Sequence, residues 1–308
     1  MDRFEAMRTL VAAVDGGSLS AASRMLGVPL PTVSRRVSDL EAHLGTQLLI
    51  RTSRKLILTE AGAAYIASVR RVLDELGEAE RAASGEYRAP RGALLVTAPI
   101  MFGKLHIAPI VHDFLAAYPD VTVRLALADT VVDLIENHVD VALRIGQLPD
   151  SSLIARRVGH VRWVVCASPD YLARRGIPQT PAALAGHDCI AFEGLQTYRE
   201  WPFAARTTTE TITIHPRFSV NTADAVIAGA VAGLGVARMM SYQAAQAVGD
   251  GALVQILAPN MPPAIPVHLV HVPHALETLK LRAFLDFVTP RLKLALGAIE
   301  DTFARARQ

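Results

Sequence analysis

Glycine and proline residues punctuate the first part of this 308-residue chain and divide it into short helical segments. Apolar residues recur every three or four positions from Phe4 to Val14, and a pair of glycines ends that run. Ser18 is a suitable N-cap for a second helix over residues 19–26, which Gly27 terminates. The pattern therefore predicts a small helical module at the N-terminus.

A third helix is predicted to begin near Pro31, because proline is well tolerated at the first helical position. Its apolar residues form one narrow stripe, which leaves Arg35 and Ser38 on the opposite side. Two short helices joined by a tight glycine-containing turn match the helix-turn-helix pattern, whose second helix enters the DNA major groove. We therefore expect Thr32, Ser34 and Arg35 to face base edges and phosphates.

Two β-prone runs follow, residues 48–51 and 55–58, and they predict a hairpin wing. Its tip presents Arg51, Arg54 and Lys55, a suitable position for contacts to backbone phosphates. Between positions 24 and 55 the net charge is +4, so the rest of the chain carries −2 within a total of +2. Phosphate contacts need only such a local basic patch. The alternative is that these charges merely solvate a helical bundle.

A longer helix is predicted to start at Thr59, its N-cap, and to run for about 25 residues before a hinge that ends near residue 92. Tyr65, Val69 and Leu76 lie along one of its sides. This stripe is expected to pair with another helix, either from a second subunit or from the N-terminal module itself.

The rest of the chain alternates strand and helix patterns, which predicts an α/β body. The predicted strands cover residues 93–97, 121–127, 139–144, 161–167, 211–220, 234–237 and 267–272. The predicted helices cover residues 104–118, 131–137, 222–232 and 276–292, the last packing on the first half of the body.

Ligands of open α/β sheets bind beyond the carboxyl ends of the strands, often where two lobes meet. Free N–H groups at helix starts in such places favour a carboxylate, so an anionic ligand is expected. The candidate ligand-binding residues are Thr97, Pro99, Met101, Phe102, Asp129, Arg144, Gly146, Asn221 and Thr222. The alternatives are structural: Arg144 pairs with Asp129 or Asp140, Asn221 is an N-cap, and Met101 and Phe102 belong to the core.

Composition excludes several classes of protein. Apolar residues make up 51% and charged residues 19% of the chain, values typical of a folded soluble protein. The longest relevant apolar stretch, residues 225–237, is too short to span a membrane, and no secretory signal is visible, so we expect a cytoplasmic protein.

Metal, redox and cofactor chemistry find little support in the sequence. The two cysteines cannot form a disulfide framework, and Cys166 lies in an apolar run typical of a buried thiol. His268 and His271 would face opposite sides of a strand, and Pro273 interrupts the tract before His274, so a zinc site is not expected. Nucleotide-binding and nucleophile motifs are missing too, and no metal or cofactor is predicted.

Five motifs, taken in order and spacing, resemble the LysR-type transcriptional regulators. They are Met7–Leu10, Gly17–Ala22, Thr32–Val37, Leu40–Gly45 and Arg51–Gly62. The match over residues 1–66 is highly specific, and the remaining chain is similar to the family's effector domain in length and layout. One departure is Leu30, where many relatives carry a polar residue; Leu30 cannot hydrogen-bond a base, so readout there is either apolar, for instance to a thymine methyl, or absent.

The resemblance implies a winged helix-turn-helix over residues 1–58, a dimerising linker helix and hinge over 59–90, and a two-lobed α/β effector domain over 91–308 that is similar to periplasmic binding proteins. Lobe 1 is expected to comprise about 91–160 and 266–308, and lobe 2 about 161–265. The expected DNA-binding residues are Ser18, Pro31, Thr32, Ser34, Arg35, Arg36, Arg51, Arg54 and Lys55.

The function implied is sequence-specific regulation of transcription, not catalysis. A small-molecule effector would bind in a cleft between the lobes, and the protein would assemble on promoter DNA as a homodimer or homotetramer. The rival hypothesis is a cytoplasmic enzyme that processes a small molecule in a two-lobed α/β body and carries an accessory N-terminal helical module.

Overall fold

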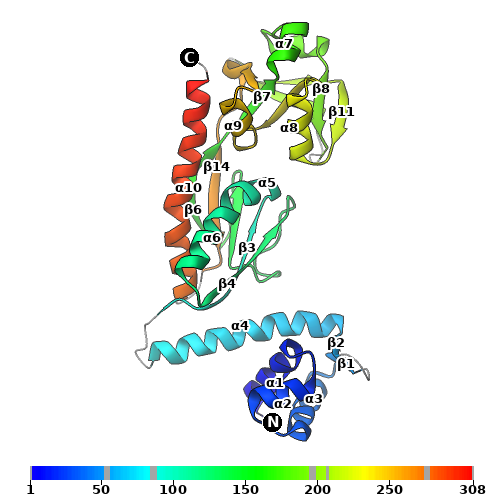
Figure 1. Ribbon diagram of the computed structural model, residues 1–308, viewed down its shortest axis with the longest axis vertical. Coiled ribbons are helices and arrows are strands. Elements are labelled where there is room, and N and C mark those ends of the chain that lie inside the picture. The colour runs from blue at the N-terminus through cyan, green and yellow to red at the C-terminus, as the bar shows by residue number, and fades with distance from the viewer. Residues whose placement is uncertain are drawn as a thin grey trace. The chain divides into compact units, whose positions relative to one another are not determined.

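A computed structural model describes residues 2–51, 56–83, 89–193, 199–205, 208–273 and 278–306, with only the backbone described at 51, 74, 75, 78, 79 and 81–83. The chain divides into two compact units, residues 1–88 and 89–308 (Figure 1). Each unit has its own core, and each is described by itself below.

The N-terminal unit is a helical module with a two-stranded wing. Its elements are α1 (Arg3–Asp15), α2 (Leu19–Leu26), α3 (Leu30–Leu44), β1 (Leu49–Arg51), β2 (Leu56–Leu58) and α4 (Glu60–Ala83). The predicted caps are confirmed: Ser18 Oγ accepts a hydrogen bond from Ala21 N at 3.1 Å, and Thr59 Oγ1 accepts one from Gly62 N at 2.9 Å. Gly27 ends α2 in the left-handed conformation, with φ of 64°.

The first half of α4 packs against its own unit. Ile66 and Val69 are buried there, and Arg70 forms an ion pair with Asp15 of α1. Val72, further along, is 39% exposed. The apolar stripe of this helix thus serves the N-terminal core at one end and is open beyond it.

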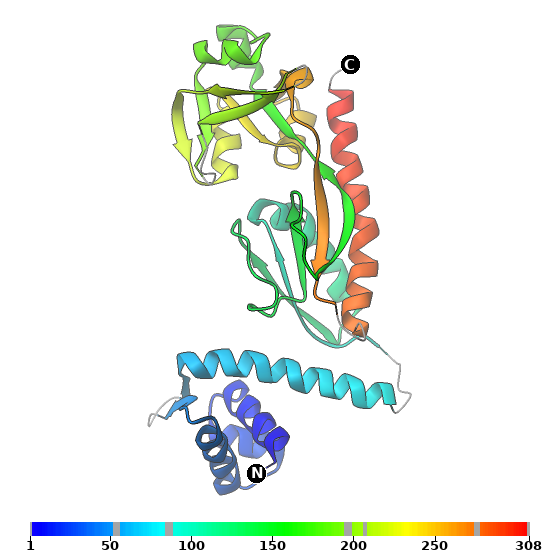
Figure 2. The same ribbon diagram turned by 180° about the vertical axis from the view of Figure 1, so that it is seen from behind.

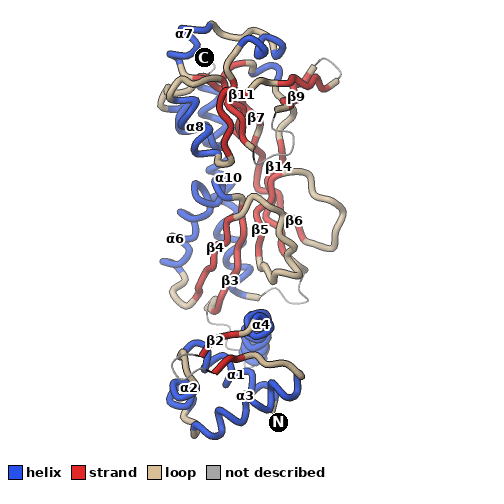
Figure 3. The backbone as a smooth tube through the Cα atoms, turned by 90° about the vertical axis from the view of Figure 1, so that its right-hand side faces the viewer, coloured by secondary structure: helices blue, strands red, loops and turns tan. Residues whose placement is uncertain are grey.

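The C-terminal unit contains two lobes, each built on a five-stranded sheet (Figure 3). Lobe 1 has the strand order β4-β3-β5-β14-β6 and lobe 2 has β11-β8-β12-β7-β13. The lobe 1 strands are β3 (Gly92–Ala98), β4 (Val121–Leu127), β5 (Val141–Ile145), β6 (Ile154–Val161) and β14 (Ile265–His271). The lobe 2 strands are β7 (Trp163–Ala167), β8 (Cys189–Phe192), β11 (Pro216–Val220), β12 (Val236–Met240) and β13 (Val254–Ile256).

Helices cover these sheets and connect them. They are α5 (Ile100–Phe102), the π-helical turn η1 (Gly103–Ile107), α6 (Ala108–Ala117), α7 (Pro169–Arg175), η2 (Pro181–Gly186), α8 (Ala223–Val231), α9 (Ser241–Gly249), η3 (Ala258–Asn260) and α10 (Leu279–Arg305). A separate hairpin, β9 (Glu200–Ala204) with β10 (Thr209–Thr213), completes lobe 2. Residues 100–117 are apolar enough for a membrane span by length and composition, but they carry Phe102, Ile107 and Phe114 into the lobe 1 core.

The last helix is longer than predicted. It begins at Leu279 and continues past Pro290 to Arg305, because its buried stripe extends through Leu296, Ile299 and Phe303. It packs on β6 in lobe 1 and on α9 in lobe 2, so it runs beside both lobes (Figures 1 and 2). One continuous core joins the lobes along this helix.

Three other predicted elements were wrong in type or extent. Residues 131–133 have no regular structure and 134–138 form turns: the Asp133 side chain accepts hydrogen bonds from Ile135 N and Glu136 N as an N-cap does, but His138 adopts the left-handed conformation, with φ of 54°, and ends the run after about one turn. The run 211–220 is two strands in two sheets, since Pro216, which has no N–H, begins β11 after β10 has ended. The helix predicted to start at Lys104 starts at Ile100 instead.

Candidate functional site

The helix-turn-helix presents the outer side of α3. Val33, Val37 and Leu40 are fully buried beneath it, as the predicted stripe requires. Pro31 and Arg35 are exposed on the outer side, and Thr32 and Ser34 are half-buried at its flanks. The first helical residue, Leu30, is 42% exposed, so its side chain is accessible.

The two neighbouring arginines of α3 have different surroundings. Arg36 is tied to α1 by an ion pair with Glu5 at 3.0 Å and a hydrogen bond to the Thr9 hydroxyl at 3.5 Å. Arg35 is exposed, and no ion pair joins it to any described residue. The Arg35 side chain can therefore contact DNA without breaking an ion pair to a described residue, whereas Arg36 holds α3 against α1.

The wing is held against α3 by the Glu41 carboxylate, whose Oε1 accepts hydrogen bonds from Leu48 N at 2.8 Å and Leu49 N at 3.0 Å. This contact fixes where β1 begins. The predicted contacts Arg54 and Lys55 lie outside the described residues, and at Arg51 only the backbone is described. Ser18 is half-buried and occupied as the cap of α2.

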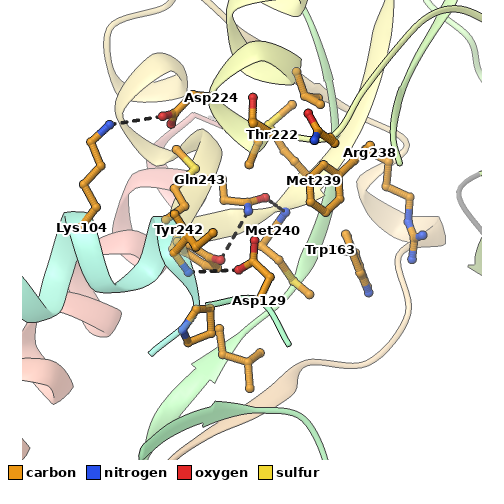
Figure 4. A pocket seen from close by; sticks show the side chains of 18 of the residues that line it. Lys104, Asp129, Trp163, Thr222, Asp224, Arg238, Met239, Met240, Tyr242 and Gln243 are labelled. Atoms are coloured by element: carbon orange, nitrogen blue, oxygen red, sulfur yellow. Dashed lines mark hydrogen bonds and ion pairs between the residues drawn. The ribbon is translucent and has the colours of Figure 1, made fainter. Parts of the chain in front are cut away.

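A cavity of about 470 Å³ opens between the two lobes of the C-terminal unit (Figure 4). This volume suits a small organic ligand. From lobe 1 it is lined by Pro99, Ile100, Met101, Lys104, Asp129 and Ile145. From lobe 2 it is lined by Trp163, Phe192, Glu200, Trp201, Pro202, Asn221, Thr222, Ala223, Asp224, Val226, Arg238, Met239, Met240, Tyr242 and Gln243.

The structure brings five of the nine predicted ligand-binding residues to this cavity: Pro99, Met101, Asp129, Asn221 and Thr222. Asp129 Oδ1 also accepts a hydrogen bond from Ile100 N at 3.0 Å, which ties the loop after β4 to the start of α5. Thr222, not Asn221, occupies the N-cap position of α8, and its side chain makes no capping bond.

The other four predicted residues are not among the described residues that line the cavity. Thr97 is buried within β3, and Gly146 lies in the turn after β5 with φ of 135°. Phe102 is fully buried, and its ring centroid lies 5.0 Å from that of Tyr242, so it belongs to the core. Arg144 donates a hydrogen bond to the Val132 carbonyl, and burial lowers its pKa. Thr97 and Arg144 lie on strands, where alternate positions face opposite sides, so their side chains turn away from the cavity.

The strand-end rule missed most of the lobe 2 lining. Trp163 and Arg238 lie on neighbouring strands, and the Arg238 guanidinium carbon stands 4.0 Å from the Trp163 ring centroid (Figure 4). Glu200 and Trp201 come from the hairpin, which was not predicted as a pair of strands. One signal was present in the sequence: a single charged residue interrupts the apolar strand 236–240.

Polar contacts organise the cavity on both sides. Lys104 Nζ of lobe 1 and Asp224 Oδ2 of lobe 2 form an ion pair at 3.2 Å. Gln243 Oε1 accepts a hydrogen bond from Met240 N at 2.8 Å, and its Nε2 donates to the Tyr242 hydroxyl at 3.3 Å. Burial raises the pKa of Tyr242, so its hydroxyl stays protonated at neutral pH.

The described residues contain no group of three side chains suited to hold a metal ion. His271 is buried with its Nδ1 3.1 Å from the Val272 carbonyl, and His274 lies outside the described part of the chain. Burial raises the pKa of both the Cys166 and Cys189 thiols to about 12, which makes them poor nucleophiles at neutral pH.

Comparison with known proteins defines the class to which this fold and cavity belong. The family described as "Bacterial regulatory helix-turn-helix protein, lysR family" matches residues 4–63, and the "LysR substrate binding domain" matches residues 88–293. The chain belongs to the LysR-type transcriptional regulators, with a helix-turn-helix DNA-binding domain and an effector-binding domain.

Particular relatives agree over nearly the whole chain. An HTH-type transcriptional regulator of Xanthomonas campestris pv. campestris is 36% identical, over 92% of this chain and 83% of its own. The regulator CrgA of Neisseria meningitidis is 33% identical, and its solved structure covers 94% of this chain and 98% of its own with a TM-score of 0.61. The full-length virulence activator AphB of Vibrio cholerae, 28% identical, covers 92% and 97% with a TM-score of 0.59.

Proposed function

We propose that this regulator reads its operator through the outer side of α3 and the wing, and that its effector binds in the interlobe cavity. The division of labour follows the predicted boundaries: residues 1–58 bind DNA, 59–90 link and dimerise, and 91–308 bind the effector. The observation that carries the DNA-binding half is Arg35, exposed above the buried stripe of α3. The cavity between the lobes carries the other half.

DNA binding is tested with the full-length protein and labelled DNA from upstream of its own or a neighbouring gene. We expect preference for that DNA over random sequence and an affinity that falls steeply with salt. Arg35→Ala should weaken specific binding by about 1–3 kcal/mol and relax preference at one base if the contact is bidentate. Arg54→Ala should weaken binding to all sequences alike.

Arg24→Ala is a matched control, because Arg24 is exposed on α2 but is not a proposed contact. Equal behaviour of Arg35→Ala and Arg54→Ala on specific and random DNA would contradict the proposed roles of helix and wing. No preference for the upstream DNA, with or without candidate effectors, would contradict the role in regulation.

We further infer that the protein acts in the cytoplasm as a homo-oligomer, a dimer or tetramer, and that it binds its effector without converting it. Support for pairing comes from the part of α4 beyond its own core, where Val72 is exposed. Val72→Glu should shift the sedimentation coefficient toward that of a monomer. Met25→Glu, which adds the same charge at an exposed α2 position, should not. Unchanged sedimentation of Val72→Glu would argue against pairing through this helix.

A further inference from the structure

Arg238 is a buried cation at the wall of the interlobe cavity. It lies on β12, and only 9% of its surface is exposed. No hydrogen bond or ion pair joins its side chain to any described residue, and its Nε is buried without a partner. Its one polar contact with described residues is the face of the Trp163 ring, 4.0 Å away.

A buried charge without a counter-ion is costly, because the Trp163 ring replaces only part of the lost hydration. The cost is visible in the protonation equilibrium: burial lowers the pKa of Arg238 to about 10. The guanidinium nevertheless remains charged at neutral pH. Two of its five N–H groups at a time can donate in parallel to a planar anion, which is the geometry of a carboxylate.

Arg238 differs from the other cation of the cavity wall. Lys104 is exposed and already paired with Asp224 across the lobes (Figure 4). Asp129 and Glu200 add two further negative charges to the described lining. Each further negative charge on a ligand would enter a cavity that already holds these carboxylates, whereas a single negative charge is matched by Arg238.

The remaining lining specifies the body of the ligand. Most of it is apolar or aromatic, including Met101, Ile145, Phe192, Trp201 and Met239. Such a surface gains from burying hydrocarbon, and methionines adapt to ligands of different outline. Polar groups for a second, neutral function of the ligand are available at Tyr242 and Gln243.

We propose that the effector is an apolar or aromatic monocarboxylate whose carboxylate group is bound by Arg238. The inference rests on the proposed role of the cavity and names the ligand class. Trp163 holds the guanidinium in place from one side, and the ligand supplies the counter-ion that the protein does not.

The chain offers a direct reporter of this site. It contains two tryptophans, Trp163 and Trp201, and both line the cavity. Tryptophan fluorescence of the full-length protein is therefore titrated with benzoate, phenylacetate and hexanoate, and with the corresponding neutral amides. We expect a saturable change with at least one carboxylate, and at least tenfold weaker apparent affinity for its amide. Inorganic phosphate should give no saturable change.

This comparison needs no variant, so it does not depend on how substitutions fold. No saturable response to any of the three carboxylates overturns the proposal. So does equal affinity for acid and amide, or a response to inorganic phosphate equal to that for the carboxylates.

Variants then assign the contact to one residue. Arg238→Met should weaken binding of the responding carboxylate at least tenfold and leave its amide unaffected, while Arg238→Lys should keep part of the affinity. Arg291→Met is the matched control, because Arg291 also stands over an aromatic ring, that of Phe287 at 3.5 Å, but on α10 and not among the residues that line the cavity. Equal carboxylate affinity in Arg238→Met and the wild type overturns the assignment.

The outcome is separable from that of the proposed function. Binding of upstream DNA is measured in the same preparations without added carboxylate. A protein that binds carboxylates but no DNA leaves the ligand class standing and defeats the role in regulation. A protein that binds its DNA but no carboxylate leaves the role in regulation standing and overturns the proposed ligand class.

Discussion

The two lobes of the effector domain share one sheet plan but contribute unequally to the cavity between them. In each sheet the second strand in the order, β3 or β8, pairs in parallel with both neighbours, and the fourth strand, β14 or β7, pairs antiparallel with both of its neighbours. Lobe 1 contributes a few residues from the ends of its strands and from α5 and η1, whereas lobe 2 contributes Arg238, both tryptophans and residues of the hairpin. Two sheets of the same topology can therefore supply unequal shares of the residues that line the cavity between them.

The difference arises from which side chains the first helix turns inward. In lobe 1, Phe102 and His106 of α5 and η1 pack against Tyr242 of lobe 2, with ring centroids 5.0 and 6.1 Å away. The rings of Phe102 and His106 in lobe 1 thus pack in the contact between the lobes and do not line the cavity. Lobe 2 leaves Trp163 and Trp201 at the cavity.

The largest expected effect tests whether the two lobes unfold as one. Phe102→Ala removes a fully buried ring from the shared core and should destabilise the effector domain by about 3–5 kcal/mol. Urea unfolding is followed by the fluorescence of Trp163 and Trp201, both in lobe 2. Because the core is continuous, the midpoint reported by lobe 2 should fall.

The neighbouring variant Met101→Ala is the control, since Met101 lines the cavity and is only partly buried. Its midpoint should fall much less. If Phe102→Ala lowers helix content without moving the tryptophan transition, the lobes unfold separately and the shared core is not cooperative.

Local signals explain how much of this molecule could be predicted from sequence. Ser18, Gly27 and Pro31 act on their own turns of helix, so the helix-turn-helix was predictable nearly to the residue. Pro99 and Asp129 were also within reach, because a parallel strand and the loop that follows it are close in sequence.

The lobe 2 side of the cavity depends on pairing between distant segments. Arg238 lies opposite Val165 and Met240 opposite Trp163, a register that no local pattern specifies. The direction of Arg144 had the same origin: its hydrogen bond to Val132 depends on turns that a helix had been expected to replace. The carboxyl ends of β3, β4 and β5 could be placed from the sequence to within one residue, but which side chains face the cavity could not.

Two glycines allow the rigidity of packing in the two lobes to be compared. A Cβ at Gly235 of lobe 2 would stand 2.4 Å from the Asp188 carbonyl oxygen, whereas one at Gly103 of lobe 1 would meet the end of the Leu127 side chain. Backbone cannot yield as a side chain can, so Gly235→Ala should cost about 1–3 kcal/mol by overpacking. Gly103→Ala should cost less, since higher helix propensity offsets part of the clash.

The midpoints of both variants are read from the same urea transition. Equal losses would show that lobe 1 is packed as rigidly around its helix start as lobe 2 is around its central strand. A larger fall in midpoint for Gly103→Ala than for Gly235→Ala would show that lobe 1 is the more rigidly packed of the two.

A pH dependence should arise where the lobes meet. Burial lowers the pKa of His106 below its ordinary value of 6.5, so the unfolded state binds a proton more readily than the folded state. The stability that His106 contributes is therefore complete above pH 6.5 and declines as the pH falls through that value. His106→Leu should flatten the fall in urea midpoint on acidification.

His112→Leu serves as the control, because His112 is exposed on α6 and has no ring contact among the described residues. The urea midpoint of His112→Leu should fall on acidification as steeply as that of the wild type. A slope in His106→Leu as steep as that of the wild type would place the acid sensitivity elsewhere in the fold.

The smallest expected effect concerns the ion pair that crosses between the lobes. Lys104 and Asp224 are 62% and 60% exposed, so water and salt screen their 3.2 Å contact. A double-mutant cycle with Lys104→Ala and Asp224→Ala should give a coupling of about 0.2–1 kcal/mol in urea midpoints that shrinks as salt is added. A coupling well above that range, or one indifferent to salt, would mean that this pair holds the lobes together. The cohesion of the two lobes would then lie in their charges and not in the core around Phe102.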